Sequence, residues 1–282
     1  MSAVRSAPIR GITRLQRRRT GRVAAVAGGV TLSATALIAS VRLLLNVPVA
    51  VPMGPVYPLA TVLASALPAF ALVALAVTID DELVTAVFPF AGVFGLLSIV
   101  ATPATLPAVL AVAAGTVAVA WRGLEDPSTA DQIAEGVVTV ILTVGALIAL
   151  AGGVGILPGL TVELGSTLTL LGVAGTPVFV DWDWGSLAVG IGAAVAVMAI
   201  GLGAPFVTGA TALVVGGIVG ASLPLVAAGM FGATSTIAGG IRSGRALPAL
   251  AGAILVTAGV PSAAPRGLAF LVALTLLVYT YD

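Results

Sequence analysis

The sequence predicts an all-α polytopic transmembrane helical bundle of about ten spans, with both termini in the cytoplasm. Hydrophobic residues make up 59% of the 282 residues and charged residues only 8%, against about 25% charged in an ordinary soluble domain. A chain this apolar on all sides of its helices must face lipid. The basic residues are also very unevenly distributed, and their distribution indicates an orientation.

Each predicted span is an apolar run close to the roughly 20 residues that cross a bilayer. Pro68 lies inside the second run, and a Leu157-Pro158-Gly159 turn separates the fifth run from the sixth. In order along the chain, the spans are expected at 23–44, 56–79, 83–101, 104–121, 136–157, 160–180, 186–204, 206–231, 246–261 and 265–281.

The last two runs are short and would each reach only roughly 25 Å. A re-entrant hairpin is the alternative, but it would leave Arg266 inside the membrane, at a cost of about 2.5–3.5 kcal/mol. We therefore expect two thin spans, with Arg266 reaching the outer interface.

All twelve basic residues are Arg, and seven of them precede the first span. A cytoplasmic N-terminus places ten of the twelve on the cytoplasmic side and only Arg42 and Arg266 outside, a strong positive-inside bias. We predict a basic cytoplasmic arm at 1–22 and a single transmembrane domain at 23–282. The arm could lie on anionic headgroups, and a twin-arginine export signal at QRRRTGRVAAV is the alternative.

The residue types that are missing from the sequence argue against several kinds of catalytic and metal site. There is no Cys and no His, so the commonest metal ligands and the commonest general base are absent. No Asp, Glu or Arg falls near the middle of an expected span, which argues against a proton relay. We expect no enzymatic activity, no catalytic residue, no cofactor and no metal site.

The stretch FVDWDWG at 179–185 alternates two carboxylates with two indoles. Trp182 and Trp184 suit the membrane interface, where the ring meets headgroups and the N–H meets water. The motif is expected to anchor the sixth and seventh spans. The alternative is a cytoplasmic cation or substrate gate that uses Asp181 and Asp183.

Two further polar segments are candidates for function. Glu163, three residues into the sixth span, could pair with Arg42 or Arg266 at the outer interface, or serve as an outer ion or proton site. Residues 232–245, GATSTIAGGIRSGR, are expected to form a flexible cytoplasmic loop in which Arg242 and Arg245 set topology. A phosphate cradle is the alternative there.

Acidic residues mark two expected helix starts, where the helix dipole favours negative charge. Asp80-Asp81-Glu82 is expected to end one helix and begin the next, with a divalent-cation site as the alternative. In the connection 122–135, Ser128 is the expected N-cap of the fifth helix.

Small residues recur at four-residue spacing, which lets helix backbones approach closely in lipid. Gly192, Gly216 and Gly220 are the predicted helix-packing positions, within the stripes Gly192/Ala196 and Ala212/Gly216/Gly220. These stripes indicate a compact bundle that could continue across a subunit interface.

Runs such as VELGSTLTLLGVAG and GSLAVGIGAAVAVMAIGLG, in a chain without Lys, His or Cys, resemble those of uncharacterised multi-pass membrane proteins of halophilic archaea. The resemblance carries no functional residue with it. It implies the multi-pass membrane architecture already predicted from the apolar runs.

Two functions remain open from the sequence. The first is a non-enzymatic subunit or scaffold in the cytoplasmic membrane, with membrane-protein partners or a homo-oligomer around it and no nucleic acid. The second is a permease for a small neutral or hydrophobic solute, suggested by the number of spans and by their Gly and Pro interruptions. A filled bundle would favour the subunit, and a polar cavity near the middle would favour the permease.

Overall fold

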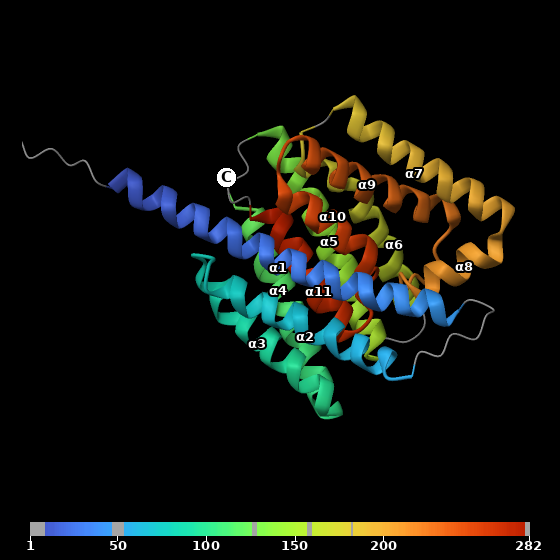
Figure 1. The fold of residues 1–282 in the computed structure, drawn as a ribbon, viewed down its shortest axis with the longest axis horizontal. Helices are drawn as coiled ribbons and strands as arrows, with labels where there is room; N and C mark the ends of the chain where they lie inside the picture. The colour runs from blue at the N-terminus through green and yellow to red at the C-terminus, as the bar shows by residue number, and fades with distance from the viewer. Residues whose placement is uncertain (1–8, 47–53, 126–128, 157–159, 182, 280–282) are drawn as a thin grey trace, which may run out of the picture.

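The protein is all-helical in the part of the chain that the computed structural model describes, residues 9–46, 54–125, 129–156, 160–181 and 183–279 (Figure 1). Eight of its helical segments are long and apolar enough to cross a membrane. This confirms the predicted class of an integral membrane bundle. The helices are α1 (Ile9–Leu45), α2 (Val56–Ala76), α3 (Glu82–Val100), α4 (Thr105–Gly123), α5 (Ala130–Gly153), α6 (Leu160–Gly175), α7 (Trp184–Gly203), α8 (Pro205–Val214), α9 (Leu223–Arg242), α10 (Ala246–Ala258) and α11 (Ala264–Val278).

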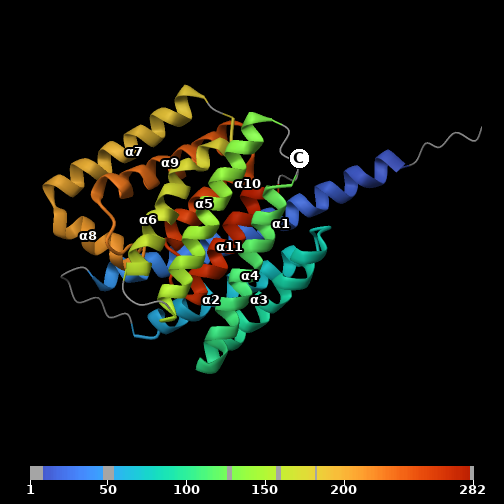
Figure 2. The ribbon, with the colours of Figure 1, turned by 180° about the vertical axis from the view of Figure 1, so that it is seen from behind.

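Helix α11 lies at the centre, and the other long helices except α7 form a ring around it (Figures 1 and 2). Neighbours around the ring follow the chain from α1 to α6, after which α9 and α10 close the ring back to α1. Helix α7 lies outside this ring against α9, and α8 crosses one end of the bundle (Figure 2). Two short 3-10 turns, Thr102–Ala104 before α4 and Thr176–Phe179 after α6, extend their helices.

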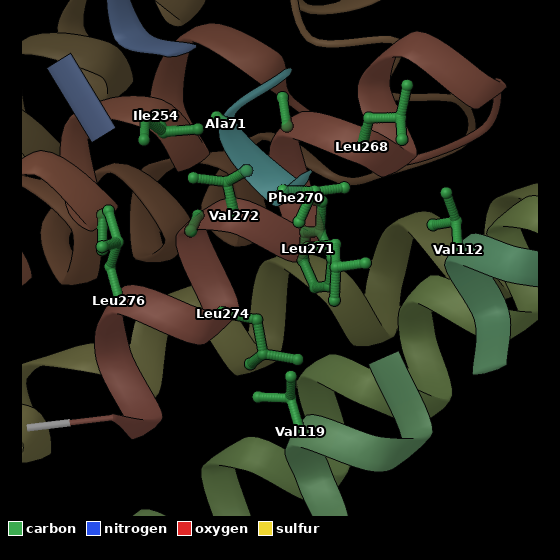
Figure 3. Packing of buried hydrophobic residues seen from close by; sticks show 14 of the residues in the cluster. Ala71, Val112, Val119, Ile254, Leu268, Phe270, Leu271, Val272, Leu274 and Leu276 are labelled. Atoms are coloured by element: carbon green, nitrogen blue, oxygen red, sulfur yellow. The ribbon is translucent and has the colours of Figure 1, made fainter. Parts of the chain in front are cut away.

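The buried core centres on the apolar side chains of α11. Twelve of its 15 residues are buried, and Phe270, Leu271 and Leu274 are each 0% exposed. Figure 3 shows these side chains meeting Val112 and Val119 of α4. Because lipid is as apolar as leucine, this core is stabilised by close packing and not by removal from water.

The first helix is continuous from the basic arm into the first span. α1 contains 37 residues from Ile9 to Leu45, and its membrane-compatible part is Thr20–Leu45. Residues 9–22 of the predicted arm therefore belong to the same helix as the first span.

The start of α5 differs by one residue from the predicted start. Ser128 lies outside the described residues, and the N-cap is Thr129. The Thr129 hydroxyl accepts from the Gln132 N–H, and the Gln132 side chain accepts from the Thr129 N–H. This reciprocal capping box satisfies two helix N–H groups, whereas the sequence predicted a cap by Ser128 alone.

The largest correction concerns the expected eighth span at 206–231. Helix α8 ends at Val214, an irregular segment follows at 215–222, and α9 then runs from Leu223 to Arg242. Residues 232–242, predicted to form a flexible loop, are therefore the second half of a membrane-compatible helix. The apolar composition concealed the break, and the hydroxyl and glycine content of 232–242 resembled that of a loop.

Candidate functional site

Two motifs that are distant in the sequence meet at one end of the bundle. The Asp183 carboxylate accepts from the Arg242 guanidinium, and the Asp181 carboxylate lies 3.7 Å from the Arg245 guanidinium. These four residues are the paired-charge cluster. They join the start of α7 to the end of α9 and the start of α10, so the four charged candidates from the two motifs form one site.

Asp183 holds the first turn of α7. Its side chain accepts from the backbone N–H of Ser186 at 2.9 Å, and the Ser186 hydroxyl donates to the Asp183 carbonyl at 2.9 Å. Hydrogen bonding by Ser186, followed by the Arg242 contact, lowers the pKa of Asp183 from 3.8 to about 2. Both interactions favour the ionised carboxylate, so the group stays charged well below neutral pH.

This depressed pKa predicts a pH-dependent contribution to stability. Because the folded pKa of about 2 lies below the ordinary value of 3.8, the contribution is complete above about pH 4 and is lost as the pH falls through about 2. We expect Asp183→Asn to lower the melting temperature at pH 6 in detergent, with the gap from wild type closing by pH 2. A gap of unchanged size across that range would contradict this role of the charge.

The paired-charge cluster is better suited to joining the helix ends than to binding a ligand. Each carboxylate has an arginine partner, and the arginine and aspartate side chains are between 38% and 76% exposed. Exposed ion pairs are screened by water and contribute little to folding. Trp184 begins α7 and is 88% exposed, as an interfacial anchor requires; Trp182 lies outside the described residues.

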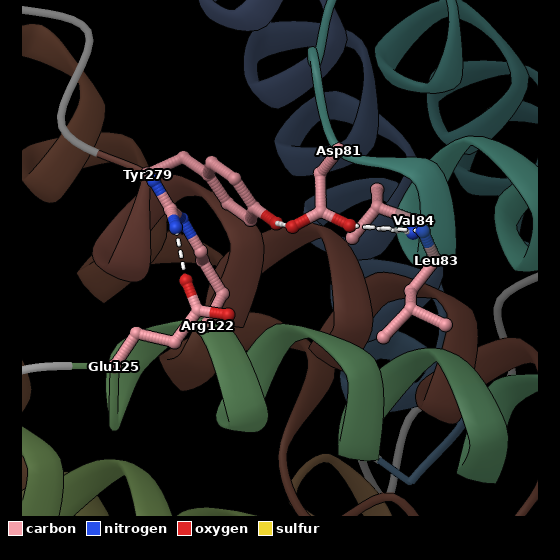
Figure 4. Close-up of polar contacts among 6 residues, drawn as sticks. All are labelled: Asp81, Leu83, Val84, Arg122, Glu125 and Tyr279. Atoms are coloured by element: carbon pink, nitrogen blue, oxygen red, sulfur yellow. Dashed lines mark hydrogen bonds and ion pairs between the residues drawn. The ribbon is translucent and has the colours of Figure 1, made fainter.

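A second polar contact lies at the same end of the bundle (Figure 4). Asp81 caps α3 by accepting from the N–H groups of Leu83 and Val84, and its other oxygen accepts from the Tyr279 hydroxyl at 3.1 Å. The predicted helix start at Asp80-Asp81-Glu82 is confirmed. Tyr279 thereby ties the end of α11 to the start of α3, a contact that no local sequence signal indicates.

The irregular segment 215–222 lies at the opposite end of the bundle, and we call it the helix break. Gly217 has φ 61° and Gly220 has φ 68°, backbone conformations that glycine adopts without the strain of a Cβ. The Gly217 N–H donates back to the Leu213 carbonyl and ends α8. Chain direction places the break opposite the charges, because α9 starts beside it and ends at Arg242.

Neighbouring elements hold the helix break at three points. The Arg266 guanidinium donates to the carbonyls of Val214 and Val215 at 3.3 and 3.1 Å. The Val260 N–H donates to the Gly216 carbonyl at 2.7 Å. On the α6 side, the Val219 N–H donates to the Ser166 hydroxyl at 3.4 Å.

These contacts change the roles expected for several residues. Arg266 binds the carbonyls at the end of α8, a contact that the sequence did not predict. Glu163 packs against Gly220, and the ion pairs recorded among the described residues do not join it to Arg42 or Arg266. Gly216 and Gly220 belong to the helix break and not to a helical packing stripe.

Helix contacts at glycine occur at positions other than those predicted. A Cβ at Gly192 would meet nothing within 4 Å, whereas a Cβ at Gly190 on the same helix would meet Ser235 and the backbone of Phe231. Small residues at four-residue spacing mark a helix face that a neighbouring helix could approach closely, but they do not show whether a helix packs there. Gly192 therefore has no packing partner within the described chain.

A small cavity adjoins the helix break between α6, α9 and α10. Its volume is about 60 Å³, and its lining includes Thr169, Gly216 and Gly259. A volume of this size holds one or two water molecules. The Thr169 hydroxyl is buried without a hydrogen-bond partner in the structure, and the described residues contain no group of three or more His, Cys, Asp or Glu side chains placed to hold a metal ion.

Comparison with known proteins is consistent with this architecture. A family model described as "Integral membrane family of unknown function (DUF8068)" matches residues 24–278, from the first span to the end of α11. No curated protein and no solved structure matches the chain.

Proposed function

Because the chain belongs to this integral membrane family of unknown function, we propose that it is a non-enzymatic subunit or scaffold for membrane-protein partners. The observation that carries the proposal is the filled centre of the bundle. The absence of Cys and His from the sequence supports the non-enzymatic part, because the usual nucleophile and general base are missing.

The centre of the ring is where a passage would be expected if the bundle itself conducted a solute. Helix α11 occupies that position and buries Leu268, Phe270 and Leu274 completely. Its neighbours α4, α2 and α10 pack directly against it. Such a filled core stabilises a rigid body, and a rigid body is suited to positioning other membrane proteins.

The face proposed for partner binding is the outer side of α7 and α8. Helix α7 buries only Ser186, Gly190 and Gly201 against the rest of the chain. Gly192 and Gly209 on these two helices have open space where a Cβ would lie. Glycine inside a helix costs about 1 kcal/mol relative to alanine, and close approach of a partner helix gives a reason for keeping it.

The experiment is a crosslinked pull-down of the tagged chain from membranes, read by mass spectrometry. We propose a halophilic archaeon as the expression host, because the chain contains no Lys, His or Cys and resembles membrane proteins of such organisms in composition. We expect a stoichiometric partner with wild type and its loss with Gly192→Leu, while the yield of folded protein stays unchanged. The matched control is Phe90→Leu, an exposed position on α3.

Two outcomes would contradict the subunit proposal. One is the recovery of the chain alone or as a homo-oligomer. The other is retention of every captured protein in the Gly192→Leu variant, which would show that partners do not bind at the outer side of α7 and α8.

We also propose ten crossings of the cell membrane, with both termini and the paired-charge cluster on the cytoplasmic side. The eight long spans with α10 and α11 give this number, and the ten arginines expected on that side support the orientation. Because the chain contains no Cys, single cysteines can be introduced and labelled. We expect a membrane-impermeant maleimide to label Asn46→Cys in intact cells and Ser243→Cys only after permeabilisation. The reverse pattern would mean that the orientation is opposite to the one proposed.

A permease is the second candidate function, and the helix break favours it. Interrupted helices supply backbone carbonyls to substrate sites in some carriers, and the cavity beside Thr169 and Gly216 adjoins this break. Glycerol or urea flux into vesicles, followed by light scattering, tests it. Flux no faster than in protein-free vesicles would remove these two solutes from consideration.

A further inference from the structure

We propose that a pocket at the end of the bundle opposite the paired-charge cluster binds a neutral amphiphile whose head group carries a hydroxyl. The pocket has a volume of about 540 Å³. It is lined by the start of α2, the ends of α3 and α5, the start of α4, and the loop that leads into α11. Small-molecule sites occupy about 300–1,000 Å³, so this volume suits a ligand. The inference does not depend on the subunit proposal.

The course of the chain fixes the position of the pocket. Helix α2 runs from Val56 towards the loop that holds Asp81, and α11 runs from Ala264 towards Tyr279. Asp81 and Tyr279 are bonded to each other at the charged end. Tyr57 and Ala264, which line the pocket, therefore lie at the other end, where an amphiphile could enter from the adjoining lipid leaflet.

Three hydroxyl groups of the lining already donate a hydrogen bond within their own helices, and their oxygens can accept one from a ligand. Thr61 donates to the Tyr57 carbonyl at 2.9 Å, Ser65 to the Thr61 carbonyl at 3.3 Å, and Ser98 to the Gly95 carbonyl at 2.7 Å. Each of these hydroxyl protons is thus used in a hydrogen bond within its own helix, while the oxygen keeps lone pairs that can accept a hydrogen bond. A ligand that donates a hydrogen bond is complementary to these oxygens.

The rest of the lining requires a ligand that is neutral and largely apolar. Among the residues that the structure describes, the lining includes no Asp, Glu or Arg, and Val62, Ile99 and Val154 lie among the hydroxyls. An ionised head group placed there would lose hydration without a charged partner. A long-chain alcohol or a lipid with a free hydroxyl satisfies both the polar and the apolar parts.

The experiment uses the full-length protein in phosphatidylcholine vesicles and a long-chain primary alcohol that carries a diazirine. After irradiation, mass spectrometry locates the label. We expect it on peptides from α2, α3 and the loop between α10 and α11. The unlabelled alcohol should compete at roughly 3- to 10-fold lower concentration than its methyl ether, because the ether cannot donate the hydrogen bond.

The matched variant is the double substitution Thr61→Val with Ser65→Ala, which removes two acceptor oxygens with little change in shape. We expect the advantage of the alcohol over the ether to shrink in this variant, because the Ser98 oxygen is then the remaining acceptor of the three. The control is Ser33→Ala on α1, whose hydroxyl also donates to a carbonyl one turn back but lies outside the pocket lining. A second variant, Thr61→Phe, should fill the pocket and abolish labelling there, and size-exclusion profiles verify folding.

Three results would overturn the inference. Equal competition by alcohol and ether would mean that the pocket takes any lipid chain. Label spread evenly over the lipid-facing helices would mean that the pocket binds nothing selectively. A fatty acid of the same length that competes better than the alcohol at pH 8 would mean that the head group is anionic.

Discussion

Replacing Gly232 by alanine is expected to destabilise the folded bundle, whereas the same substitution at Gly192 is expected to stabilise it slightly. A Cβ at Gly232 would meet the Val173 carbonyl oxygen and the backbone of Ala174, where α9 crosses the end of α6. Backbone atoms cannot rotate away, so the helices must separate. Overpacking of this kind costs about 1–3 kcal/mol, and we expect the upper end for Gly232→Ala and loss of the folded state for Gly232→Leu.

The comparison with Gly192 separates packing from helix propensity. A Cβ at Gly192 would meet nothing within 4 Å, so alanine there gains up to about 1 kcal/mol from its greater helix propensity. The measurement is the melting temperature of purified protein in one detergent, with folded yield from size-exclusion chromatography. If both variants shifted in the same direction, the close approach at Gly232 would not be the reason for the glycine.

The sequence could predict the membrane bundle because apolar length is a local property. The apolar runs before α8 each correspond to a helix, although α1 and α5 begin at Ile9 and Ala130, ahead of the span starts expected at 23 and 136. The same reasoning joined 206–231 into one span, since an apolar segment gives the same signal whether its backbone is helical or broken. Pro224, in the first turn of α9, was the available signal, because proline is favoured at helix starts.

The site contacts could not be predicted because they join distant parts of the chain. Asp183 and Arg242 are 59 positions apart, and Tyr279 and Asp81 are 198 apart. Residue types identified the FVDWDWG carboxylates and Arg242 and Arg245 as candidates, but not as partners. The small-residue stripes had the same limitation, since they identify smooth helix faces without saying which neighbour covers each one.

Replacing Arg266 by leucine is expected to loosen the helix break while leaving the rest of the bundle folded. The guanidinium donates to the carbonyls of Val214 and Val215, which lie at the end of α8 and have no further helical turn to satisfy them. Unsatisfied carbonyls are costly where water is scarce. Hydrogen bonds to charged groups contribute about 1.5–3 kcal/mol, so we expect local destabilisation of about 2 kcal/mol.

Hydrogen exchange in detergent measures this effect where it occurs. A local loss of about 2 kcal/mol corresponds to roughly 30-fold faster exchange for amides in and beside the helix break, including Gly217 and Ile218, whose N–H groups donate back into α8. Arg266→Lys should fall between wild type and leucine, since an ammonium keeps the charge but lacks the planar fork that reaches two carbonyls.

Arg42→Leu is the control, because Arg42 lies near Arg266 and its loss alters the charge at that end without touching the α8 carbonyls. If exchange accelerated equally in the Arg42 and Arg266 variants, net charge and not carbonyl binding would hold the break. If Arg266→Leu left exchange unchanged, the contacts from Val260 and Ser166 would be sufficient to hold it. Acceleration confined to the Arg266 variants would identify this side chain as the restraint on the helix break between α8 and α9, and so as the position to vary when solute flux is measured.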